Sequence, residues 1–109
     1  MFSIEQQQWD GLDNFRQRVK QASCELADSI ETGMMSDSKT AVFKVREASK
    51  TLDLPAELAT QFEELGRAAW RGVTSGDGVN TDVYTRASTA IGVIGNIERL
   101  LDSITVATT

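Results

Sequence analysis

The chain has 109 residues, the size of one domain, and 40% of them are hydrophobic and 25% charged, as in ordinary folded proteins. It contains no histidine and a single cysteine, so it lacks the commonest general base and metal ligand and has no internal disulfide. Its net charge of −5, from 16 acidic and 11 basic residues, disfavours direct binding to nucleic acid.

The first predicted helix covers residues 3–33. Ser3 and Gln6 have the spacing of a capping box at its start, and Gly33 marks its end. Gly11 weakens the first turns, since glycine costs about 1 kcal/mol relative to alanine inside a helix. A start of the regular helix after Gly11 is therefore an alternative. Apolar residues in steps of three and four form its core face: Leu12, Phe15, Val19, Ala22, Leu26 and Ile30.

Two shorter helices are predicted next, at residues 37–53 and 56–71. Pro55 separates them, because the residue before proline avoids helical angles and proline suits the first turn of a helix. Ser36, Asp37 and Ser38 are suitable N-caps for the earlier helix, and Gly72 is the predicted C-terminal cap of the later one. The core faces are Ala41, Val45, Ala48 and Leu52, and then Leu58, Phe62, Leu65 and Ala69.

Residues 72–80 are rich in glycine and predict a flexible loop. Asn80 or Thr81 then caps a long last helix over residues 80–106. Its apolar residues follow an unbroken four-three repeat: Val83, Ala87, Ala90, Ile94, Ile97, Leu101 and Ile104. No stretch of the sequence alternates as a strand does.

These elements predict an all-α fold, a small antiparallel four-helix bundle that occupies residues 1–109 as a single domain. Short joints between helices favour antiparallel neighbours. We expect the long first and last helices to form the main pair, with the shorter helical hairpin packed across them.

Several function classes lack their sequence patterns. Gly76-Asp77-Gly78 has no phosphate-loop ending, and neither a dinucleotide fingerprint nor a calcium loop is present. Cys24 lies in mid-helix among acids and amides, which indicates an inert thiol. We therefore expect no catalytic residue, no metal and no cofactor.

No secretory signal is recognisable, and the most apolar stretch, residues 90–97, is far shorter than a membrane span. We expect a soluble cytoplasmic protein that does not insert into membranes. Export by a route without a signal peptide stays open.

Apolar residues outside the core faces predict a contact surface for a partner or for a second copy. The last helix is apolar over roughly 200 degrees, where a surface helix needs little over 100. Large apolar groups off the core face are frequent contact anchors. The predicted surface comprises Trp9, Phe43, Tyr84, Ile91, Val93 and Leu100, and Leu54 also lies off its core face. The alternative is that neighbouring helices cover these residues.

The sequence thus favours a non-enzymatic protein–protein interaction module of accessory, inhibitory or chaperone-like type that docks on a larger partner. We also expect a homodimer, with the contact on the last helix, where Gly92 and Gly95 would let a second backbone approach. A small-ligand carrier that uses the bundle interior is an alternative, and a cavity with converging polar groups would indicate it.

Trp70-Arg71-Gly72 resembles the Trp-x-Gly turn of the small helical-hairpin proteins exported by type VII secretion. The resemblance covers three residues and implies an exported helical hairpin as a further alternative. The chain departs from that family in two respects. In that family the turn lies near mid-chain between two long helices, whereas here the motif follows a third predicted helix. No aromatic residue follows Tyr84 to form the C-terminal aromatic-x-x-x-acid signal.

Overall fold

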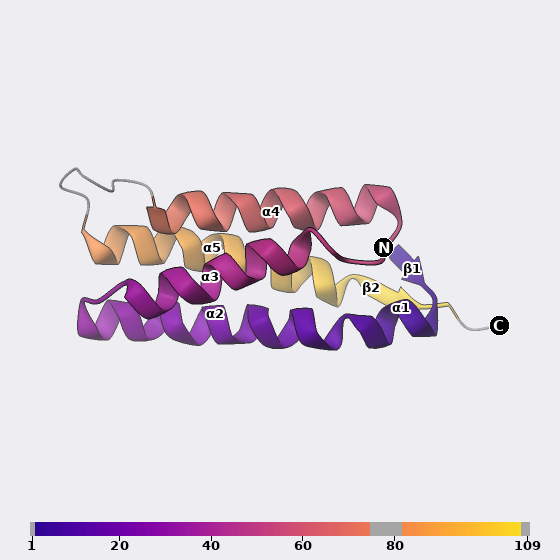
Figure 1. The fold of residues 1–109 in the computed structure, drawn as a ribbon, viewed down its shortest axis with the longest axis horizontal. Helices are drawn as coiled ribbons and strands as arrows, with labels where there is room; N and C mark the ends of the chain where they lie inside the picture. The colour runs from indigo at the N-terminus through magenta and orange to yellow at the C-terminus, as the bar shows by residue number, and fades with distance from the viewer. Residues whose placement is uncertain (1, 75–81, 108–109) are drawn as a thin grey trace.

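The computed structural model describes residues 2–74 and 82–107 (Figure 1). Its elements in chain order are β1 Phe2–Ile4, α1 Gln6–Gly11, α2 Asp13–Thr32, α3 Ser36–Ser49, α4 Ala56–Thr74, α5 Val83–Asp102 and β2 Ile104–Val106. The helices α2 to α5 form a four-helix bundle, and α1 is a short turn before α2. The predicted all-α bundle is confirmed.

The four long helices form a ring. α2 packs on α3 and α5, and α4 packs on the same two helices from the other side. Consecutive helices run in opposite directions, so the first and last elements meet at one end of the bundle (Figure 1). The resulting molecule is elongated, with extents of 53 × 21 × 20 Å.

The core lies along the axis of this ring. Toward the end where α2 begins, the Phe15 and Phe62 rings meet edge to face, with centroids 5.3 Å apart, so α2 and α4 touch across the diagonal. Aliphatic side chains from all four long helices surround this pair. The buried polar residues in the described part are Ser29, Ser38 and Ser49. Each hydroxyl donates to a backbone carbonyl three or four residues earlier, which satisfies it without a partner from another helix.

The start of the predicted first helix is wrong, because residues 2–4 form a strand and the cap lies later. The backbone N–H of Glu5 donates to Oε1 of Gln8 at 3.0 Å, which is the capping interaction we had placed at Ser3. α1 ends at Gly11, and α2 begins after a turn at Leu12. At the other end Gly33 adopts φ 75° and caps α2, as predicted. Ile30, expected in the core, is 37% exposed.

The middle helices differ from prediction at three ends. Met35 rather than a serine is the N-cap of α3, and α3 stops at Ser49, before a turn that leads to Pro55. α4 continues to Thr74 instead of ending at residue 71, so Gly72 is a buried interior residue and not a cap. Only α3 is short, and α4 is nearly as long as α2 and α5. The predicted flexible loop over residues 72–80 begins inside a helix, and its remainder lies outside the described residues.

The last helix is also shorter than predicted. Asp82 is its N-cap, and its carboxylate accepts the backbone N–H of Thr85 at 2.7 Å, which lowers the pKa of that carboxyl. The predicted caps Asn80 and Thr81 lie outside the described residues. α5 ends at Asp102, and residues 104–106 pair with residues 2–4 as parallel strands.

The β1–β2 pair was not predicted, because three-residue strands carry no readable alternation. The four-helix topology brings the two chain ends together, and paired backbones there satisfy their hydrogen-bonding groups. Ile4 aligns with Val106, and both Ile4 and Ile104 are buried beneath the pair, where they close one end of the core.

Two glycines of α4 allow close approach to its neighbours. A Cβ on Gly66 would lie 2.9 Å from Oγ of Ser49 and 3.3 Å from Cα of Arg46, on α3. A Cβ on Gly72 would lie 3.4 Å from the backbone nitrogen of Ala90, on α5. By contrast, nothing lies within 4 Å of the corresponding position at Gly92, on the outer face of α5.

We therefore predict that Gly66→Ala and Gly92→Ala differ in effect. Each gains about 1 kcal/mol of helix propensity. Gly66→Ala also forces α3 and α4 apart, and overpacking of this kind costs about 1–3 kcal/mol. Urea unfolding should thus show Gly66→Ala to be less stable than Gly92→Ala by about that amount. Equal stabilities would contradict the close contact at Gly66.

Candidate functional site

The six residues predicted to form a contact surface do not lie together. Trp9 is on α1, Phe43 is on α3, and the other four are on α5, which lies diagonally opposite α3 in the ring. Phe43 and Tyr84 are exposed, at 42% and 64%. The remaining four are partly buried and pack against the core: Trp9, Ile91, Val93 and Leu100. The six residues are thus spread over three helices, and their role as a partner or self-association surface stays a prediction.

Trp9 is held by its own neighbourhood. The guanidinium of Arg16 lies over the Trp9 ring, 4.2 Å from its centroid, and Arg16 also pairs with Asp13 at 3.2 Å. A cation stacked on an indole stabilises both side chains. Trp9 is therefore a local structural contact between α1 and α2, and we remove it from the candidate surface.

Phe43 has a partner that the sequence analysis did not assign to a surface. Its ring meets the Trp70 ring edge to face, with centroids 5.4 Å apart and an interplanar angle of 64°. Phe43 is on α3 and Trp70 on α4, so the pair bridges the two helices close to the Gly66 contact. We call these two residues the aromatic ridge. One signal for Trp70 was present: it follows Ala69, so it lies about 100° away from the core face of its helix.

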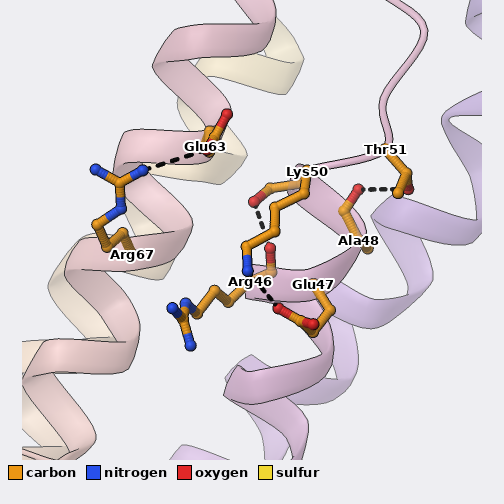
Figure 2. A network of polar contacts seen from close by, with 8 residues as sticks. Arg46, Glu47, Ala48, Lys50, Thr51, Glu63 and Arg67 are labelled. Carbon is orange, nitrogen blue, oxygen red and sulfur yellow. Dashed lines mark hydrogen bonds and ion pairs between the residues drawn. The ribbon is translucent and has the colours of Figure 1, made fainter.

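Charged side chains also lie on these two helices, among them Glu47 on α3, Lys50 at its C-cap, and Glu63 and Arg67 on α4 (Figure 2). Nζ of Lys50 lies 2.9 Å from Oε2 of Glu47, and Nη2 of Arg67 lies 3.2 Å from Oε1 of Glu63. The hydrogen bond from Lys50 lowers the pKa of Glu47. Both pairs are exposed and intrahelical, so they add little to stability.

Arg46 differs from these paired residues. Its side chain extends from α3 toward α4, and its Nε is buried without a hydrogen-bond partner (Figure 2). A buried donor without an acceptor is energetically unfavourable. Arg46 is thus a cation held beside the ridge with unused hydrogen-bonding capacity.

A second surface runs along the outer side of α5. Between Tyr84 and Ile97 this helix has one charged residue, Arg86. Gly92 is exposed with open space above it, whereas a Cβ on Gly95 would lie 3.8 Å from Nη1 of Arg99. Val93 and Leu100 belong to the half-buried flank rather than to this outer side.

One hollow in the structure is relevant to the alternative of a small-ligand carrier. A hollow of about 280 Å³ at the end of the bundle is lined by amide side chains, Gln7, Gln8 and Asn14, together with Phe15 and Leu52 among others. It opens at the surface between α1, α2 and the α3–α4 connection, and the axis of the ring is filled by the Phe15–Phe62 contact.

Three further features of the described part of the chain concern metal binding, the cysteine and membrane insertion. No group of three acidic or cysteine side chains there is placed to hold a metal ion. Cys24 is exposed, as its position off the core face predicted. Within residues 2–74 and 82–107, no helix is long and apolar enough to cross a membrane.

The Trp-x-Gly resemblance does not extend to the structure. Trp70 and Gly72 lie inside α4, which continues to Thr74, so the motif forms no turn between helices. Comparisons with known protein families, curated proteins and solved structures find no match to this chain. The surface residues of the chain are therefore the basis for any functional proposal.

We predict that the ridge contributes little to folding. Phe43→Ala should lower the free energy of unfolding by about 1 kcal/mol, the value of an exposed edge-to-face aromatic contact. Phe62→Ala, which empties the core, should cost about 3–5 kcal/mol. Urea unfolding of both variants measures this difference. A loss at Phe43 as large as that at Phe62 would make Phe43 a core residue.

Proposed function

We propose that this chain is a non-enzymatic protein–protein interaction module that docks on a larger partner through the α3/α4 aromatic ridge. The observation that carries the proposal is the Phe43–Trp70 pair, in which a large apolar ring stays 42% exposed at a helix–helix junction. Aromatic residues are enriched among the few residues that supply most of the energy of an interface.

The geometry of the pair favours binding in a second way. The two rings fix each other edge to face, and the helices beneath them meet at Gly66. A partner therefore meets side chains that are already ordered, and little conformational entropy is lost on binding. An accessory, inhibitory or chaperone-like role in a reducing cytoplasmic compartment suits a chain with one exposed thiol.

The proposal is tested by affinity purification from the native host with matched variants. Phe43→Ser should lose the protein that co-purifies with wild type, because the central anchor is removed. Ala27→Ser, at an exposed site on α2, should retain it. Mass spectrometry identifies and quantifies what is recovered. Equal recovery by Phe43→Ser and Ala27→Ser would refute docking at the ridge.

Self-association through the outer side of α5 is a second candidate. Its support is the exposed Tyr84 ring on a helical face that is nearly free of charge, with open space above Gly92. A symmetric two-fold contact is the commonest arrangement for such a face. This face lies away from the ridge, so a dimer of this kind would leave the ridge accessible.

We predict that wild type is a dimer and that Tyr84→Asp is a folded monomer, because a charge is tolerated on a wet surface but is costly in a contact. Leu100→Asp should instead lower stability, since Leu100 packs against the core. Light scattering and circular dichroism across a range of protein concentrations measure both effects. A wild type that stays monomeric at the highest concentration would end this candidate.

A further inference from the structure

The charges near the aromatic ridge are distributed differently from those of the whole chain. Residues 38–46 of α3 and 65–74 of α4 hold five of the 11 basic residues and none of the 16 acidic ones. The chain as a whole carries a net charge of −5. The two rings therefore lie in a basic band that is bordered by Glu47 on α3 and by Glu63 and Glu64 on α4, and Glu63 pairs with Arg67.

Three cations flank the rings directly. Lys39 and Arg46 lie four residues before and three residues after Phe43, and Arg67 lies three residues before Trp70. Side chains at these spacings are neighbours on a helix surface. Arg46 makes no ion pair within the described residues, and its Nε lacks a hydrogen-bond partner.

A shallow groove lies on the surface of α4, and Arg67 is among its lining residues. It has a volume of about 520 Å³, an apolar floor that includes Leu65 and Ala68, and Arg67 and Arg71 among its lining residues together with Glu64. Arg67 belongs both to this groove and to the surroundings of Trp70. The surface thus offers an aromatic anchor point with cations beside it, and Arg67 connects it to the separate groove on α4.

We propose that the aromatic ridge binds an acidic amphipathic protein segment, in which carboxylates surround an aromatic or leucine side chain. This inference rests on the proposed interaction function and names the chemistry of its partner. Carboxylates pair with guanidinium groups through two parallel hydrogen bonds, which suits Arg46 and Arg67. Arg46 also retains a donor, its Nε, that has no hydrogen-bond partner within the described residues.

The scale of the basic band favours a protein segment over an extended polyanion. Electrostatic interactions are screened over about 8 Å at physiological salt. A short segment on the ridge therefore senses mainly the local cations. A nucleic-acid duplex or an anionic bilayer would also face the wider surface, whose excess of carboxylates repels it.

The test begins with selection of a displayed random-peptide library on the intact chain, after removal of peptides that also bind Phe43→Ser. The expected survivors carry Asp or Glu beside an aromatic or leucine residue. Survivors without acidic enrichment would overturn the acidic partner and leave the ridge as an interaction site. If no peptide survives, both the partner class and docking at the ridge are overturned.

A synthetic copy of the most enriched peptide is then titrated against charge variants. Arg46→Gln/Arg67→Gln should bind at least about tenfold more weakly, and wild-type affinity should fall as NaCl is raised. The control Lys20→Gln/Arg99→Gln removes the same charge from exposed sites on α2 and α5 and should bind like wild type. Circular dichroism confirms that both variants are folded. Equal affinities for the two double variants would overturn the role of the ridge cations.

Two further probes address the alternative occupants. Vesicles of phosphatidylcholine with phosphatidylserine, and a DNA duplex, should not bind the wild-type chain. Binding of either probe that is tighter than that of the peptide and is lost in Arg46→Gln/Arg67→Gln would overturn the protein-segment inference.

Discussion

The close approach of α4 to its two neighbours is the contact on which the other features depend. Gly66 admits the backbone of α3, and Gly72 admits the backbone of α5 at Ala90. A Cβ at Gly66 would force α3 and α4 apart, whereas one at Gly72 would just reach van der Waals contact with Ala90. The absence of a side chain at Gly66 therefore decides how closely α3 and α4 pack.

The same approach creates the candidate interaction surface. Trp70 lies one turn beyond Gly66 on α4, and Phe43 lies one turn before Arg46 on α3. Because the helices meet at Gly66 and Arg46, the two rings come within 5.4 Å of each other. The contact at Gly66 and the aromatic pair on the surface thus share one physical cause.

Burial separates structural from functional roles among the large side chains. Trp9 is stacked under Arg16, and Val93 and Leu100 pack against the core. Trp70 is also partly buried against the core, so Phe43 is the exposed member of the ridge. Phe43 and Tyr84 retain exposed rings on different sides of the bundle. The two exposed rings thus mark two separate faces, one aromatic and flanked by basic residues and one nearly uncharged.

The sequence predicts only those site residues that stand out within their own helix. Phe43 and Tyr84 were identified because they break the helical pattern of their own elements, and that is a local property. Trp70 was not predicted as a surface residue, because in the sequence it stands out only as part of the Trp-x-Gly motif. Its relation to Phe43 joins residues 27 positions apart, and helical periodicity within one element carries no information on such a pair.

The sequence by itself determined the helical class, the core faces and several boundaries, because apolar periodicity, Pro55 and Gly33 act within a few residues. Gly72 illustrates what it could not decide. A glycine near a helix end suits a cap and a helix contact equally well, and only the position of Ala90 makes it a contact. The β1–β2 pair likewise arises because the ring of helices brings the chain ends together. Tertiary structure decided these features, since each depends on a partner that is distant in the chain.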